Sequence, residues 1–170
     1  IVGHSMGSLV AFDVAARYPD RITALAMVGT ALPMPVGEVL LNSAKEDSPL
    51  AKDMINFWSH SQAGHLGGSQ VPGTWMIGKL NRLLERAGPG VIHNDLLACA
   101  EYTKGMERSQ DVKAPTLLIL GEDDMMTPVK NAKALADAIP ESRTVILPNC
   151  GHAIVNEAPN EMLDALVTLI

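Results

Sequence analysis

Apolar and polar positions along the chain predict strands and helices in alternation. Two continuous apolar runs, residues 23–28 and 115–120, are typical of parallel strands that helices cover on both faces. Residues 1–2 look like the end of another strand, and residues 143–147 predict one more. Strands that alternate with helices favour a single parallel α/β sheet whose connections are right-handed.

Apolar residues at helical spacing follow the predicted strands. The first predicted helix ends before Pro19, because proline cannot continue a helix. Thr127-Pro128 supplies an N-cap and a first-turn proline for a helix that runs through Ile139. A last helix opens at Pro159 and has apolar residues along one side. These helices are expected to flank the sheet.

Residues 33–109 depart from this alternation and predict a helical insertion. Ser48-Pro49 begins one amphipathic helix, and a second one ends at Gly88-Pro89-Gly90. A glycine-rich loop between them provides the slack that a mobile lid needs. We therefore expect a first part of the core at 1–32, a helical lid or cap at 33–109, and the rest of the α/β core at 110–170.

Charge and hydropathy exclude several classes of partner. Thirteen Lys and Arg against nineteen Asp and Glu give a formal net charge of −6, which disfavours a nucleic-acid partner. Every apolar run is far shorter than the roughly 20 residues that cross a bilayer, so we expect no membrane span. Cys99 and Cys150 are expected to be free, buried thiols, which favours the cytoplasm. The sequence leaves the oligomeric state open.

Gly3-His4-Ser5-Met6-Gly7 matches the Gly-x-Ser-x-Gly pattern of a nucleophile turn between a strand and a helix. The turn is so tight that a Cβ at either glycine would collide with neighbouring backbone. The helix that follows points its N-terminus at the serine, so the N–H of Met6 can donate to a developing oxyanion. The pattern therefore predicts that Ser5 is a nucleophile.

A serine nucleophile needs a base and a residue that orients the base. Asp123 and Asp124 follow one predicted strand, and His152 follows the next. Because the carboxyl ends of parallel strands meet at one edge of a sheet, these side chains are expected close to Ser5. His152 is the expected base. Asp124 is favoured as the orienting acid, with Asp123 as the alternative.

The order serine, acid, histidine resembles the α/β-hydrolase fold family, with Gly121 three residues before Asp124 and Gly151 directly before His152. The resemblance extends over almost the whole chain. It implies a Ser-Asp-His esterase or lipase with Ser5 as nucleophile. It covers only the C-terminal portion of the family fold, because the first four strands and the loop that donates a second oxyanion N–H are not in this sequence. The chain also starts within a predicted strand and stops within a predicted helix, so we expect both ends to be cut.

The expected reaction is hydrolysis of a small, mostly neutral carboxylic ester through an acyl-enzyme intermediate. Residues 33–109 contain no cluster of either charge, so nothing there attracts a charged substrate. The expected pocket residues are His4, Met54, Trp58, Trp75 and Met125. Family members with the same three residues also cleave thioesters, lactones and carbon–carbon bonds or act as perhydrolases, and these remain alternatives. A catalytically incompetent fragment or a ligand-binding relative is an alternative of another class.

No cofactor and no metal are expected. Residues 73–80 approach a phosphate-binding loop, but Leu80 stands where Ser or Thr would coordinate magnesium, and no strand precedes them. His60, His65 and His93 lack the spacing and the additional ligands of a zinc site.

Overall fold

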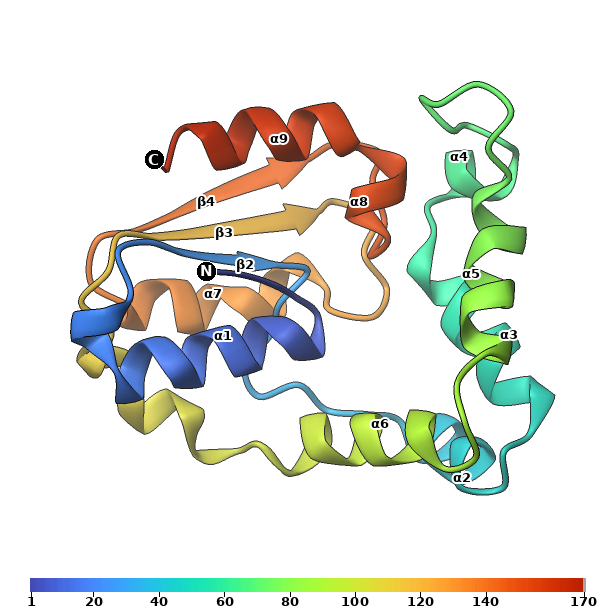
Figure 1. Ribbon diagram of the computed structural model, residues 1–170, viewed down its shortest axis with the longest axis horizontal. Helices are drawn as coiled ribbons and strands as arrows, with labels where there is room; N and C mark the ends of the chain where they lie inside the picture. The colour runs from blue at the N-terminus through green and yellow to red at the C-terminus, as the bar shows by residue number, and fades with distance from the viewer. Residues whose placement is uncertain (170) are drawn as a thin grey trace.

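The computed structural model describes residues 1–169, and these contain a four-stranded parallel sheet (Figure 1). The strands lie side by side in the order β1 (Val2–His4), β2 (Leu25–Val28), β3 (Thr116–Gly121) and β4 (Ser142–Leu147). Val28 is the register partner of His4 on one side and of Ile119 on the other. Each neighbouring pair of strands is parallel, so all four strands run in one direction. The predicted parallel α/β sheet with flanking helices is confirmed.

Helices cover both faces of the sheet (Figure 1). Helices α1 (Met6–Arg17) and α7 (Val129–Ala138) pack on one face of the sheet. Helices α8 (Ile154–Glu157) and α9 (Pro159–Val167) pack on the other face. The short 3-10 helix η1 (Pro19–Arg21) connects α1 to β2, and a second one, η2 (Lys104–Asp111), precedes β3. All three helices that the sequence predicted next to the strands are present.

Strand β3 is apolar apart from Thr116, because its side chains enter the cores on both faces of the sheet. Leu118 and Leu120 point into the core beneath α1 and α7, whereas Leu117 and Ile119 point into the core beneath α8 and α9. All six residues of β3 and all four of β2 are buried. By contrast, β1 pairs only with β2 and forms an edge, so Val2 is 54% exposed.

Between β2 and β3 the chain leaves the sheet and forms further helices. They are α2 (Glu38–Lys45), α3 (Pro49–Ser59), α4 (Gln62–His65), α5 (Met76–Glu85) and α6 (Val91–Glu101). In Figure 1 the arrowheads of β3 and β4 point toward α3, α4 and α5, so the carboxyl ends of the strands face these helices. The sequence predicted α3 and α5 but missed α2, α4 and α6. Ser48 caps α3 as predicted, because its hydroxyl accepts a hydrogen bond from the N–H of Leu50 at 3.3 Å.

The start of α7 differs from the prediction that Thr127 is its N-cap. The helix begins at Val129, Pro128 directly precedes it, and the Thr127 side chain does not cap it. The Thr127 hydroxyl donates instead to the carboxylate of Asp124 at 2.8 Å. A side chain that looked like a local helix signal therefore belongs to the loop that holds the acid.

The state of the cysteines and the absence of a membrane span were also predicted from the sequence. Cys99 and Cys150 are both buried and both free of a disulfide, as predicted. Within residues 1–169, every helix is too short or too polar to cross a lipid bilayer.

Candidate active site

Ser5 occupies a strained turn between β1 and α1. Its φ of 52° and ψ of −122° lie where a residue with a Cβ is rarely found, and its N–H donates to the carbonyl of Val28 at 2.9 Å. Gly3 makes the turn possible, because a Cβ there would collide with the backbone carbonyl of Gly7. The prediction that a Cβ at either glycine would collide is wrong for Gly7, where an added Cβ meets no atom within 4 Å. The strain and the glycine requirement are those of a nucleophile turn.

Two buried hydroxyls that the sequence analysis missed support this turn. Ser8 donates through its Oγ to the carbonyl oxygen of Ser5 at 2.6 Å, and the same Oγ lies 2.7 Å from the hydroxyl of Thr30. Ser8 and Thr30 are both fully buried. They fix the backbone at the carbonyl group of Ser5. The sequence did not predict their contact, because the two residues belong to different elements.

His152 and Asp124 form a buried pair at the carboxyl end of the sheet. The Nδ1 of His152 lies 2.7 Å from Oδ2 of Asp124, and the two residues are 5% and 4% exposed. The Oδ1 of Asp124 also accepts hydrogen bonds from the backbone N–H of Met126 at 2.8 Å and of Thr127 at 2.7 Å. This arrangement orients the imidazole so that its Nε2 remains available for proton transfer.

The charge of Asp124 is favoured by its partners. Burial alone would raise the pKa of this carboxyl group, but the hydrogen bonds from His152 and Thr127 and the charge of His152 together lower it. Asp124 is therefore an anion at neutral pH. Asp123, the alternative acid, is exposed, and its backbone N–H donates to the carbonyl of Cys150 at 2.9 Å. The structure brings Asp124, and not Asp123, to His152.

The imidazole of His152 also lies beside the turn that contains Ser5. The ring of His4, the residue before Ser5, is 4.8 Å from the ring of His152 between centroids, and the Nε2 of His4 is 2.8 Å from the His152 carbonyl oxygen. Gly29 follows β2, and a Cβ there would lie 3.1 Å from His152 Nδ1 and 3.2 Å from His4 Nε2. A Cβ at Gly29 would therefore press on both imidazoles, and the φ of 54° at this position also favours glycine.

The pair of His152 and Asp124 and the turn that contains Ser5 therefore lie at the same end of the sheet, although the three residues come from different parts of the chain. Met6 is the first residue of α1, so its N–H has no partner within the helix and is free to donate next to Ser5. Within residues 1–169 the Ser5 hydroxyl has no hydrogen bond to His152. Such bonds often form or tighten only when substrate binds.

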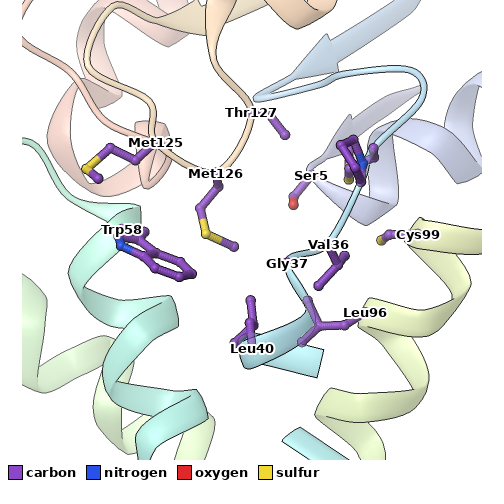
Figure 2. A pocket seen from close by; sticks show the side chains of 12 residues that line it. Ser5, Val36, Gly37, Leu40, Trp58, Leu96, Cys99, Met125, Met126 and Thr127 are labelled. Carbon is purple, nitrogen blue, oxygen red and sulfur yellow. The ribbon is translucent and has the colours of Figure 1, made fainter. Parts of the chain in front are cut away.

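A cavity of about 250 Å³ opens in front of Ser5 (Figure 2). Trp58 lies across the cavity from Ser5 in Figure 2, and Met126, Leu40 and Leu96 form other parts of the cavity wall. None of the twelve residues that line it is charged, and they are Ser5, Met34, Pro35, Val36, Gly37, Leu40, Trp58, Leu96, Cys99, Met125, Met126 and Thr127. The cavity therefore suits a small apolar group positioned against a hydroxyl.

A model of the alpha/beta hydrolase fold matches residues 1–159 of the chain. The chain belongs to the alpha/beta hydrolase fold family. The elbow at Ser5, the acid after β3 and the histidine after β4 follow the chain order of that fold.

Several relatives of this alpha/beta hydrolase are named hydrolases. The chain is 28% identical over 170 residues to "Putative carbamate hydrolase RutD" of Klebsiella pneumoniae subsp. pneumoniae, which covers 90% of this chain and 58% of that protein. It is 27% identical to a 2-hydroxy-6-oxononadienedioate/2-hydroxy-6-oxononatrienedioate hydrolase of Comamonas testosteroni, over 89% of this chain and 55% of that protein. A solved structure of a thermophilic esterase matches 98% of the chain and 63% of its own length, with a TM-score of 0.81 and 28% identity. The chain thus spans less than two thirds of each of these relatives.

The predicted pocket residues of this alpha/beta hydrolase divide into two groups. Trp58 and Met125 line the cavity, but His4, Met54 and Trp75 do not. Met54 packs within the cluster around Leu40, and Trp75 is 71% exposed with its ring against Gly78. Most of the wall was not predicted from the sequence, because it belongs to α2, α6 and loops whose placement depends on the whole fold; the wall residues not predicted include Met34, Val36, Leu40, Leu96, Cys99 and Met126.

The cysteines and histidines outside this arrangement have other environments. Burial, followed by the carboxylate of Glu157, raises the pKa of the Cys150 thiol to about 12, so this thiol is a poor nucleophile. Burial also raises the pKa of Cys99, which lies on the cavity wall. Among residues 1–169, His, Cys, Asp and Glu form no group of three or more that suits a metal ion.

Proposed function

We propose that the protein is a serine hydrolase that cleaves a small, mostly neutral carboxylic ester through an acyl-enzyme. The observation that carries the proposal is the buried hydrogen bond of 2.7 Å between His152 and Asp124, beside the strained turn of Ser5. A hydroxyl, an oriented imidazole and a buried anion at one sheet edge are the parts that acyl transfer requires.

In the proposed reaction, His152 Nε2 takes the proton of the Ser5 hydroxyl as Oγ attacks the carbonyl carbon of the ester. Asp124 holds Nδ1 and stabilises the imidazolium that forms. The N–H of Met6 donates to the oxyanion of the tetrahedral intermediate. His152 then gives its proton to the leaving alcohol, and water hydrolyses the acyl-enzyme by the same route.

The cavity supports an ester whose acyl or alcohol group is apolar and small. A volume of about 250 Å³ lies at the small end of ligand pockets, and the wall offers no Lys or Arg to a carboxylate. The relative from Comamonas testosteroni acts, by its name, on a dioate, which carries two carboxylates. An uncharged wall disfavours such a dianion, because its charges would lose hydration without gaining a partner.

The decisive experiment is the Ser5→Ala substitution in the full-length protein. Wild type is expected to hydrolyse a short-chain nitrophenyl ester and to bind a fluorophosphonate covalently. Ser5→Ala is expected to lose both, since the nucleophile is gone. Ser69→Ala removes a hydroxyl from the loop between α4 and α5 and serves as the matched control.

Two other outcomes of this experiment would contradict the proposal. Unchanged labelling of Ser5→Ala would contradict the nucleophile assignment. Stoichiometric labelling of wild type without turnover of any ester would favour a ligand-binding relative that keeps the three residues but hydrolyses slowly.

A further inference from the structure

Glu157 is a buried carboxylate that the proposed reaction does not use. It ends α8, five residues after His152, and is 8% exposed. Within residues 1–169 it forms no ion pair with a Lys, Arg or His side chain. A buried carboxylate is costly unless hydrogen bonds replace its lost hydration, so its partners indicate what it does.

The partners of Glu157 are hydrogen-bond donors from two separate segments. Oε2 accepts from the backbone N–H of Ser61 at 3.0 Å and from the Ser61 hydroxyl, and Oε1 accepts from the N–H of Gly151 at 3.2 Å. The Ser61 N–H also lies 3.3 Å from Oε1. Ser61 belongs to the connection between α3 and α4, whereas Gly151 directly precedes His152. One carboxylate therefore joins the helical segment to the loop that carries the imidazole.

A second contact fixes the residue that follows His152. The backbone N–H of Ala153 donates to the carbonyl of Ser59, the last residue of α3, at 2.7 Å. The two segments approach so closely that a Cβ on Gly151 would lie 2.7 Å from the nitrogen of Ser61. Glycine at position 151 is therefore required by close packing of two backbones. The residues on both sides of His152 are held by the same short stretch, 59–61.

We propose that Glu157 is a positioning residue that fixes the His152 loop to the connection between α3 and α4. This inference rests on the proposed function. We call the hydrogen bonds of Glu157 to Ser61 and Gly151 the clamp. Trp58, at the end of α3, forms the cavity wall opposite Ser5, so the clamp keeps the position of that wall fixed relative to His152. Because Glu157 binds backbone N–H groups and not the imidazole, it acts on the position of His152 and leaves the ring's partners unchanged.

The test is Glu157→Gln in the full-length protein. The amide keeps the shape of the carboxylate but turns an N–H₂ group toward donors, so the clamp opens. We expect kcat for a nitrophenyl ester and the rate of Ser5 labelling by a fluorophosphonate to fall by about 10- to 100-fold, the effect of a misplaced catalytic group. KM is expected to change less than kcat, since the substitution replaces no residue that lines the cavity.

Glu161→Gln is the matched control. Glu161 is an exposed carboxylate on α9 that accepts hydrogen bonds from the Gln70 side chain, so its loss removes one nearby negative charge without touching the clamp. We expect wild-type kcat for this variant. A folded Glu157→Gln protein with wild-type kcat and labelling rate would overturn the proposal, even if its melting temperature were lower, because that result describes a purely structural residue.

Two further measurements keep the proposal open to refutation. If Glu157→Gln does not fold, Ser61→Ala removes the hydroxyl that donates to Glu157, together with the N-cap hydrogen bond that this hydroxyl accepts from the N–H of Gly64 at 3.1 Å. The labelling rate of Ser61→Ala is expected to fall by about 3- to 10-fold, the effect of one net hydrogen bond to Glu157. An unchanged rate in Ser61→Ala would overturn the proposal in that case. Amide hydrogen exchange at Gly151 and Ser61 is expected to accelerate in the Glu157→Gln or Ser61→Ala protein. This readout needs no turnover, so it separates a failed clamp from a failed assignment of esterase activity.

Discussion

The α/β layers and the helical segment between β2 and β3 differ in how completely their residues are buried. Every residue of β2 and β3 is buried, and cores lie on both faces of the sheet. In the helical segment, α6 buries only Cys99, and α5 buries only Met76 and Gly78. Ser5, Asp124 and His152 all come from the first region, whereas Leu40, Trp58, Leu96 and Cys99 of the cavity wall come from the second.

The residues of the proposed reaction and the cavity-wall residues that would select the substrate therefore lie in regions of different burial. Asp124 follows the fully buried strand β3 and pairs with the buried His152, so the geometry of this pair is fixed, because moving it would disturb a close-packed core. Half-buried helices tolerate substitution more easily, so the wall of the cavity can change while the chemistry is kept. Three substitutions test this division, each with a control in the contrasting environment.

Asp124→Asn gives the largest expected effect. The amide no longer holds the imidazole in the required tautomer and no longer stabilises an imidazolium, so we expect kcat to fall by about 10⁴-fold. Asp123→Asn, one residue away and exposed, is expected to keep wild-type kcat. Steady-state kinetics of the two folded proteins measure this. A larger loss in Asp123→Asn would assign the orienting role to the other carboxylate.

Leu117→Ala tests the stability of the sheet region. Leu117 is fully buried in β3, so the cavity left by its side chain is expected to lower the free energy of unfolding by about 2–5 kcal/mol. Leu83→Ala in α5 removes a side chain that is 64% exposed, and a change within about 0.5 kcal/mol is expected. Urea denaturation gives both values. Equal losses would show that the two regions do not differ as described.

Trp58→Ala gives the smallest of the three effects and acts on selectivity. Removing the indole enlarges the cavity opposite Ser5, so kcat/KM for a bulkier acyl ester is expected to rise about 10-fold relative to the acetyl ester. Trp75→Ala removes the same side chain from a position that is 71% exposed and outside the cavity, and the ratio is expected to stay constant. The result would argue against Trp58 as a specificity residue if both variants behaved alike.

The sequence was most informative where burial is complete. Residues 115–120 form β3 within one residue of the prediction, because a strand covered on both faces must be apolar throughout. The rule that parallel strands end at one edge predicted that Ser5, Asp124 and His152 lie close together, and the hydrogen bond between Asp124 and His152 agrees with it for two of the three. Only the Asp124–His152 contact selected between Asp124 and Asp123, since adjacent residues in a loop carry no directional signal.

The cavity could not be predicted in the same way. Trp58 and Met54 lie four residues apart on α3, yet only Trp58 reaches the cavity, because Met54 packs against neighbouring helices. Helix α6 was missed because its apolar residues are mostly half-buried and form no strong stripe. Glu157 looked like an ordinary charged residue, and its burial depends on Ser61, 96 residues earlier in the chain.

The carboxylate of Asp124 accepts hydrogen bonds from two backbone N–H groups, from the Thr127 hydroxyl and from His152. An anion held by so many fixed donors has little freedom to rotate when the charge on the neighbouring ring changes. In water, solvent dipoles would have to turn at that moment, and this reorganisation energy would add to the barrier. Folding has already oriented the dipoles around Asp124, so the proton transfer to the imidazole that we propose meets an environment that is set in advance.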